Sequence, residues 1–347
     1  MRWSRSFIAI ASPCRLPSAP AKWRRMSLAS HLLLQQARRI VPMGAAIGLC
    51  ALAAWSLHRV GQKLSLDDMR QALAAVPHGA ILAAIATTVA SFTAFILQDY
   101  LALKRASRGL SLSRAAAGSF IAQSIAHVTG FAILVGGALR ARYFLASGLA
   151  LTSILSVQAS FSVSFGLADT LLTGLATLLR PTLASETTLL PVGWLRFAAC
   201  ALILGALGVF ALATFLRQHH LALRYNLAVA PARTLALQIL CSVVDILFVA
   251  ATLYLLLPDG LGVGYVQVLA CYLIAVTLGL WSHVPAGLGV FEATILALIH
   301  APQPQIAPVV AALLAFRAIY HLLPFALGCM LLATVELERR WTRRQSA

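Results

Sequence analysis

Long apolar segments constrain this chain more than any other feature of its sequence. Six of them reach about the 20 residues that a helix needs to cross a hydrocarbon layer about 30 Å thick. They are residues 40–58, 79–103, 149–179, 197–216, 234–257 and 306–332. Because 60% of the residues are hydrophobic and only 11% are charged, a soluble domain with a single core is excluded. The sequence therefore predicts an all-α, polytopic membrane protein with about six full spans.

The basic residues predict the topology of these spans. The formal net charge is +17, but Lys and Arg occur in short clusters between the apolar segments, so we expect no nucleic-acid partner. Residues 1–39 contain eight basic residues and no acidic one, which places them in the cytoplasm by the positive-inside rule. Counting spans from there leaves 21 of the 27 Lys and Arg residues inside. We therefore expect a basic cytoplasmic segment (1–39), a transmembrane domain (40–335) and a basic cytoplasmic tail (336–347).

The first 25 residues are rich in Arg and Ser and have only a short apolar stretch, Phe7–Ala11. This stretch is too weak for a secretory signal, and the alternatives are a transit peptide or a translation start further along the chain. We expect the start to be Met26.

Two further apolar segments must begin and end on the same side of the membrane. Segment 115–139 lies between two cytoplasmic basic clusters, and Thr129–Gly130 supplies a bend. Segment 265–300 must begin and end outside, and it is broken by Pro285, Gly287 and Gly289. We expect two re-entrant hairpins that enter from opposite faces. Two adjacent short helices, or two crossings of which one is half-length, are the alternatives.

Polar residues recur at helical spacing within the apolar segments, which indicates that they face other helices or a cavity. They are Ser153, Ser156, Ser160 and Ser164; Ser119, Gln123 and His127; and Gln238, Ser242 and Asp245. Small hydroxyl residues also let helices approach closely, and this alternative holds for the serines. An ionisable group at membrane depth costs about 2.5–3.5 kcal/mol on insertion scales, so we expect His127 and Asp245 to face a cavity or a partner. Asp99 and Asp169 raise the same question, although Asp99 also fits the membrane interface.

Several function classes lack the residues that they need. The sequence has no GxxxxGK[ST] motif and no HExxH or other metal-binding spacing. The six cysteines are scattered without a CxxC pair, and we interpret them as small apolar residues. The longest segment outside the membrane is the basic N-terminus, so the chain offers no room for a soluble catalytic domain. We therefore expect no cofactor and no metal, and we favour a protein that is not an enzyme.

Four stretches together resemble the membrane domain of the lysylphosphatidylglycerol synthase/flippase proteins. They are the segment from Asp99 to Phe144 with its GGALR sequence, DILFVAATLYLLLP (245–258), SHVPAGLGVFEATILAL (282–298) and AFRAIYHLLPFALG (315–328). In two-part members of this family the membrane domain moves aminoacylated phosphatidylglycerol between leaflets, and a cytoplasmic domain synthesises it. The resemblance covers roughly residues 40–335 and implies a stand-alone form without the synthase domain.

The resemblance and the chemistry both indicate a lipid head group as the ligand. Arg140 and Arg142 follow a pair of glycines at the inner boundary, where they could bind a phosphate, unless they are ordinary cytoplasmic anchors. Gly287 and Gly289 precede Glu292, so free backbone N–H groups there could meet an anion. A mere kink held by packing is the alternative.

Glu292 and Arg317 are opposite charges in two apolar segments. Neither is stable alone in hydrocarbon, and His321 lies one helical turn after Arg317. We expect Glu292 and Arg317 to pair, or else to line the same aqueous cavity separately.

These observations predict a lipid translocase of the bacterial inner membrane that moves a phospholipid, with aminoacyl-phosphatidylglycerol as a candidate. The expected partners are membrane lipids. The alternative is a non-transporting membrane subunit that supports a separately encoded lipid-modifying enzyme.

Overall fold

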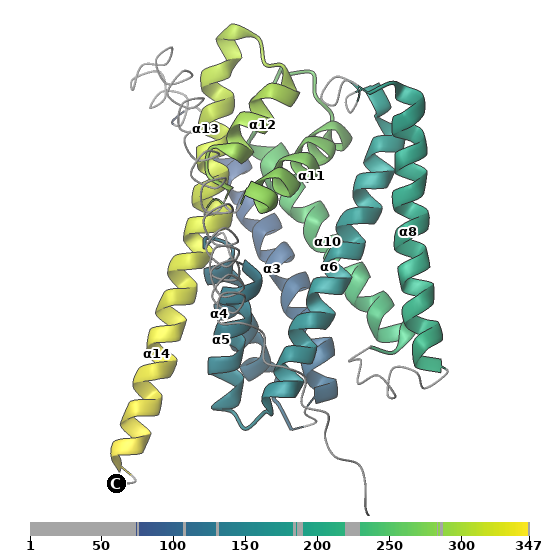
Figure 1. Cartoon of the computed structure of the whole chain (residues 1–347). Helices are drawn as coiled ribbons and strands as arrows, with labels where there is room; N and C mark the ends of the chain where they lie inside the picture. The colour runs from purple at the N-terminus through teal and green to yellow at the C-terminus, as the bar shows by residue number, and fades with distance from the viewer. Residues whose placement is uncertain are drawn as a thin grey trace, which may run out of the picture. The chain divides into compact units, whose positions relative to one another are not determined.

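The computed structural model describes residues 74, 76–106, 109–129, 132–182, 185, 190–218, 230–282, 284 and 287–345. Within these ranges the chain is helical, as predicted (Figure 1). The helices of ten or more residues are α3 (His78–Ala106), α4 (Leu112–Ala126), α5 (Ala132–Leu145), α6 (Leu151–Leu179), α8 (Val192–Gln218), α10 (Ala232–Leu256), α11 (Tyr265–Ser282), α12 (Val290–Ile299), α13 (Ile306–Phe316) and α14 (Leu323–Gln345). The predicted segment 1–39 and the predicted span 40–58 lie outside the described residues.

Six helical runs in the described part of the chain are long and apolar enough to cross a membrane. They are His78–Arg105, Leu151–Leu179, Val192–Arg217, Ala232–Leu256, Tyr265–Ser282 and Gln303–Glu338. Five of them coincide with predicted spans. The sixth, α11, lies within the segment expected to form the second hairpin, and the other helix of that segment, α12, has 10 residues and is too short to span. The molecule is a multi-pass membrane protein.

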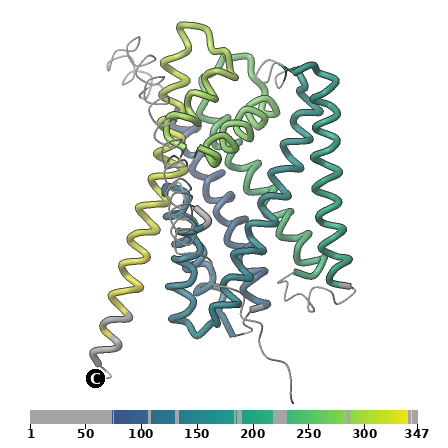
Figure 2. The backbone as a smooth tube through the Cα atoms, viewed as in Figure 1, coloured from purple at the N-terminus to yellow at the C-terminus, as the bar shows by residue number. Residues whose placement is uncertain are grey.

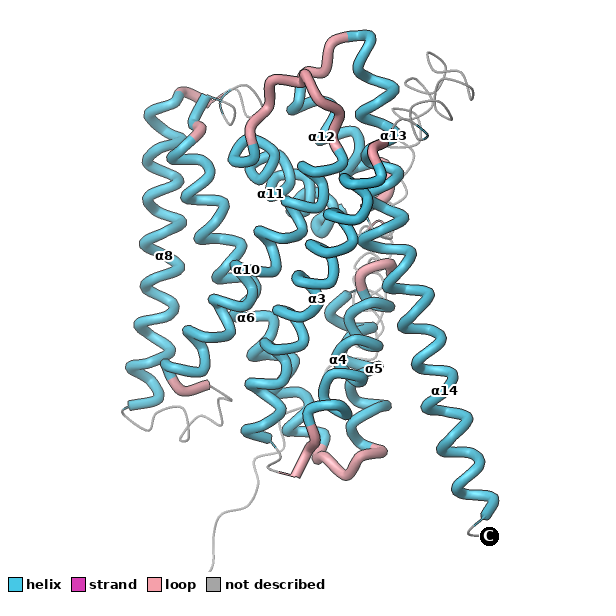
Figure 3. The backbone as a smooth tube through the Cα atoms, turned by 180° about the vertical axis from the view of Figure 1, so that it is seen from behind, coloured by secondary structure: helices cyan, strands magenta, loops and turns pink. Residues whose placement is uncertain are grey.

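Two helical hairpins, α4 with α5 and α11 with α12, are inserted into the bundle from opposite ends. Helices α4 and α5 lie in the lower half of Figure 1, whereas α11 and α12 lie in the upper half, and Figure 3 gives the same arrangement from behind. The break predicted near Thr129 falls between Ala126 and Ala132, and the second break falls between Ser282 and Val290. Both interrupted segments therefore return to the end from which they came.

The last span is also broken, in a way that the sequence did not predict. Between α13 and α14 the residues Arg317–Leu322 form a π-turn (η3), in which the N–H of Leu323 donates to the carbonyl of Ala318. Pro324 follows directly and has no N–H for a regular α-helical bond, so the wider turn relieves the helix where a donor is missing. Single π-turns within α-helices often occur at functional sites.

Polar side chains join the spanning helices near the centre of the bundle. Helices α3 and α10 are linked by the hydroxyls of Thr87 and Thr252, 2.8 Å apart. The Gln98 amide on α3 donates to the Ser164 hydroxyl on α6 at 2.8 Å. Ser160 in turn donates to the Gln238 side chain at 2.8 Å. Two of the predicted serines thus serve as links between helices, which agrees with their alternative reading as packing residues.

The described basic residues near the helix ends gather mainly at one end of the bundle. Lys104 and Arg105 end α3, Arg142 lies in the last turn of α5, and Arg217 lies in the last turn of α8. The tube in Figure 2 shows these helix ends at the same side as the C-terminus. This grouping is what the positive-inside rule requires of helices that end on a common side.

Candidate functional site

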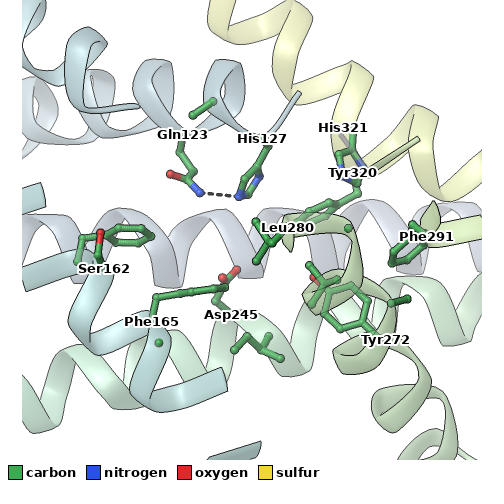
Figure 4. A pocket seen from close by; sticks show the side chains of 18 of the residues that line it. Gln123, His127, Ser162, Phe165, Asp245, Tyr272, Leu280, Phe291, Tyr320 and His321 are labelled. Atoms are coloured by element: carbon green, nitrogen blue, oxygen red, sulfur yellow. Dashed lines mark hydrogen bonds between the residues drawn. The ribbon is translucent and has the colours of Figure 1, made fainter. Parts of the chain in front are cut away.

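A cavity of about 240 Å³ lies where the hairpins α4–α5 and α11–α12 meet the π-turn. Its walls come from α4, α5, α6, α10, α11, α12, α13 and η3 (Figure 4). The polar side chains that line it are Gln123, His127, Arg140, Gln158, Ser162, Asp245, Tyr272, Arg317, Tyr320 and His321. The rest of the lining is apolar or glycine, so the cavity combines an apolar wall with a few charged groups, as ligand sites do.

One wall is held by a buried ion pair between α5 and α3. The Arg140 guanidinium donates from Nη2 and Nε to one carboxylate oxygen of Asp99, at 2.7 and 2.9 Å. A third bond, from Nη1, goes to the Gln158 side-chain oxygen at 2.9 Å. The guanidinium carbon also lies 5.3 Å from the centre of the Phe161 ring. The side chains are only 1% and 0% exposed, so Asp99 and Arg140 face each other inside the protein and not the solvent.

A second buried ion pair joins α12 to the π-turn and confirms the predicted pairing of Glu292 with Arg317. The Arg317 Nε atom lies 2.6 Å from Glu292 Oε1. The other carboxylate oxygen of Glu292 accepts a bond of 2.7 Å from the N–H of Gly289 at the start of its own helix. Arg317 also lies 5.0 Å from the centre of the Phe291 ring, and its Nη1 is 3.4 Å from His321 Nε2. The acid therefore caps α12 and fixes it to the last span.

The N–H groups of the two glycines predicted as anion donors are engaged within the chain. Both have positive φ angles, 60° at Gly287 and 80° at Gly289, which explains why glycine occupies these positions. The N–H of Gly287 donates to the carbonyl of Val284 at 2.8 Å, and that of Gly289 serves Glu292. Both donors are thus satisfied within the chain. Gly287 also lines the cavity, and its backbone packs closely on Gly279, where a Cβ would lie only 3.2 Å from the Gly279 Cα.

Asp245 is the cavity carboxylate with no ion-pair partner among the described residues. It lies near the middle of α10, it is buried, and its carboxylate points into the cavity (Figure 4). The Ser91 hydroxyl of α3 donates to it, and this hydroxyl is also 3.2 Å from the Tyr320 hydroxyl. The prediction that Asp245 faces a cavity is confirmed.

His127 also lines the cavity, as predicted, at the end of α4. Its Nε2 atom contacts the Gln123 side-chain amide (Figure 4). Its ring lies among aromatic rings, with centroid distances of 6.0 Å to Phe92 and 5.9 Å to Tyr320. The polar face predicted for the first hairpin thus contributes two residues to the cavity, whereas Ser119 is buried elsewhere.

Arg142 does not line the cavity, although the sequence analysis grouped it with Arg140. Two positions along a helix turn the side chain to a different face. Arg142 is 62% exposed, and its Nε atom lies 3.0 Å from Glu336 on α14. Asp169 does not line the cavity either. Whether any of the predicted residues binds a substrate stays a prediction.

The cavity reaches the surface of the bundle between α6 and α11. Gly166 on α6 and Leu280 on α11 both line it, and both are exposed, Leu280 by 51%. No neighbouring side chain occupies the space beside Gly166. Because exposed residues of both helices line the cavity, we infer a lateral opening at this point.

The sequence profile of a protein family, described as the lysylphosphatidylglycerol synthase transmembrane region, matches residues 43–328. The chain belongs to this family. The protein slr0712 of Synechocystis sp. is 27% identical over 322 residues, which cover 90% of this chain and 97% of that protein. The inner membrane protein YbhN of Escherichia coli K12 is 33% identical over 136 residues, which cover 38% of this chain and 42% of YbhN. The resemblance stated from the sequence is thereby confirmed.

Sequence reasoning missed three parts of the site. Asp99 was not recognised as the partner of Arg140, because the two residues are 41 positions apart and only the tertiary fold joins them. Gln158 could have been predicted as a site residue, since it is a polar residue within an apolar span. Tyr320 was missed because a tyrosine in a span is ordinarily a packing residue. Among the described residues, no cluster of His, Cys, Asp and Glu has the arrangement of a metal site.

Proposed function

We propose that the protein is a lipid translocase of the inner membrane that moves the head group of a phospholipid through this cavity. Aminoacyl-phosphatidylglycerol is the first substrate to test, because the chain belongs to the family named after lysylphosphatidylglycerol synthase. The observation that carries the proposal is a cavity with charged walls, inside a bundle of spanning helices, that opens sideways between α6 and α11.

The size and the opening of the cavity both fit this role. The cavity is smaller than the roughly 300–1,000 Å³ that is common for ligand pockets. A volume of about 240 Å³ suits a head group but not the acyl chains attached to it. The opening beside Gly166 and Leu280 lets those chains stay in the hydrocarbon while the head group enters. Two helical hairpins from opposite ends that meet at one cavity also resemble the arrangement of discontinuous helices in transporters.

The orientation belongs to the same proposal. We place the helix ends that carry Lys104, Arg142 and Arg217, together with the C-terminus, in the cytoplasm. The hairpin of α4 and α5 then enters from the cytoplasmic face, and the hairpin of α11 and α12 enters from the outer face. Each leaflet faces one of the two hairpins.

The proposal is tested with purified protein in liposomes that contain fluorescent phospholipids. A membrane-impermeant reductant bleaches the outer leaflet, and a translocase exposes inner-leaflet lipid to it as well. We expect bleaching beyond the outer leaflet with the protein and not with empty liposomes. Aminoacyl-phosphatidylglycerol labelled on its acyl chain is compared with phosphatidylglycerol to identify the preferred head group.

A pair of glycine variants tests the lateral opening. Gly166→Trp fills the open space at the cavity mouth, and we expect it to reduce the transport rate by at least tenfold. Gly208→Trp is the matched control, because Gly208 is an exposed glycine on α8 that also has open space beside it but does not line the cavity. Equal transport by both variants would contradict entry at this point. If no lipid moves and a lipid-modifying enzyme copurifies, the protein is a non-transporting subunit instead.

A further inference from the structure

The charges around the cavity do not balance. Arg140 pairs with Asp99 and Arg317 pairs with Glu292, so each cation has one anion. Asp245 is left over, because no described Lys, Arg or His lies within ion-pair distance of it. The two histidines apart, the described charged groups of the cavity and their partners leave a single excess negative charge.

A lone carboxylate in this position is costly. An ionised group taken from water into an apolar interior costs several kcal/mol unless a charge or several hydrogen bonds compensate it. Asp245 is 3% exposed and receives one hydrogen bond, from the Ser91 hydroxyl. The two ion pairs are already satisfied internally, so neither arginine is available without leaving its own partner bare.

We propose that Asp245 is a proton-binding site, and that the proton on its carboxyl group balances the charge of the cavity. The proton comes from water that enters the cavity, and it adds to a carboxylate oxygen to give the neutral acid. Ser91 then hydrogen-bonds the acid, and Tyr320 extends the chain of hydroxyls toward the π-turn.

The groups that face Asp245 from the neighbouring helices support this assignment. Helix α3 contributes Ser91, and the π-turn contributes Tyr320, which are neutral hydroxyls. Helix α11 contributes Tyr272, another neutral hydroxyl group that lines the cavity together with Asp245.

The charged and imidazole groups on the other walls give no counter-ion. Arg317 and His321 lie on the π-turn, His127 ends α4, and Glu292 lies on α12 in its pair with Arg317. The Gln123 side-chain amide N–H donates to His127 Nε2. Helix α13 carries no titratable residue.

The site suits a proton better than a metal cation. Hard cations such as Ca²⁺ or Mg²⁺ take about six or more oxygen ligands. Only the Ser91 and Tyr320 hydroxyls join the carboxylate in the described hydrogen-bond network. A proton needs only one carboxylate oxygen to bind and one hydrogen-bond acceptor beside it. Asp245 provides the first and the Ser91 hydroxyl provides the second.

Infrared difference spectroscopy on the purified protein in detergent tests the proposal, because a protonated carboxyl group has a C=O band that a carboxylate lacks. We expect such a band at pH 7 in the parent protein. It should be lost in Asp245→Asn and kept in Asp259→Asn, a matched control at an exposed aspartate. Asp169→Asn is measured as well, so that any band from that residue is assigned separately.

A second variant keeps the test decisive if Asp245→Asn fails to fold. Ser91→Ala retains the acid and removes its hydrogen bond, so the band should persist at a shifted frequency. A parent spectrum without a protonated carboxyl band, or a band that Asp245→Asn and Ser91→Ala leave unchanged, overturns the proposal. Loss of the band on adding sodium chloride, but not choline chloride, assigns the site to a metal cation and also overturns it.

The consequence for transport rests on the proposed function, whereas the spectroscopic test does not. If Asp245 carries a proton and the protein moves lipid, a pH difference across the liposome should change the transport rate at least threefold in the parent. Asp245→Asn should abolish that dependence. A protein that moves no lipid can still show the Asp245 band, so failure of the proposed function and failure of the proton site are distinguishable.

Discussion

The ion pair between Glu292 and Arg317 permits a quantitative test of how the broken helix is held in place. Both side chains are about nine-tenths buried, and Nε lies 2.6 Å from Oε1. Removing one member of a buried pair leaves an uncompensated charge and typically costs about 3–5 kcal/mol. We expect Glu292→Gln and Arg317→Gln each to lower the free energy of unfolding by that amount.

The double variant should lose less than the sum of the two single variants. Once both charges are gone, neither is left bare, so we expect a coupling energy of about 2–3 kcal/mol. Glu292→Gln retains an acceptor for the Gly289 N–H, so the cap of α12 survives and the cycle reports mainly on the ion pair. Unfolding by SDS in mixed micelles, followed by circular dichroism, gives the four free energies.

The pair of Arg142 and Glu336 is the matched control for this cycle. It joins two helices at a similar distance, 3.0 Å, but the arginine is mostly exposed to solvent. Exposed pairs contribute little, so its cycle should show no measurable coupling. If the losses for Glu292 and Arg317 add to within about 0.5 kcal/mol, the buried pair does not hold the helix and the reasoning is refuted.

Three other outcomes are expected. In a cysteine-free background, Ala146→Cys after α5 should react with an impermeant thiol reagent only when cells are opened, and labelling of intact cells would refute the first hairpin. Gly174→Ala should cost about 1–3 kcal/mol of stability, because a Cβ there lies 2.7 Å from Ile203. Gly208→Ala on α8 should be neutral. Equal stability of the two variants would contradict close packing of α6 on α8. Arg140→Gln should lower lipid transport at least tenfold, with partial recovery in Arg140→Lys. Arg142→Gln should transport normally. The reverse order of effects would move the site to the cytoplasmic surface.

Five of the spans and the two breaks in the described part of the chain were predictable, because both depend on local quantities. Hydropathy fixes which segments can cross, and the clusters of basic residues fix where they must return. The segment around Gly287 was recognised for the same reason, since a proline and two glycines interrupt a helix wherever they occur. The coarse fold of a membrane protein is therefore readable from short windows of sequence.

Only one of the two buried ion pairs was predicted from the sequence. Glu292 and Arg317 could be matched because each stood out as an ion within an apolar segment. Asp99 and Arg140 were not matched, since both lie near basic clusters where an interface position explains a charge equally well. Only the packing of α5 against α3 shows that both side chains are buried. The identity of a buried pair is a tertiary property, and the cost of burial alone does not name the partner.

The two buried pairs also limit how the protein can change shape. Each pair fixes one re-entrant hairpin to a spanning helix, α5 to α3 through Arg140 and α12 to the π-turn through Glu292. Opening either pair costs about 3–5 kcal/mol, which corresponds to a factor of roughly 100 to 5,000 in population. A movement that keeps both pairs closed avoids this cost. If the cavity is exposed to each leaflet in turn, as the proposed function requires, each hairpin is expected to move together with its spanning helix, with the π-turn as the element whose hydrogen bonds can rearrange.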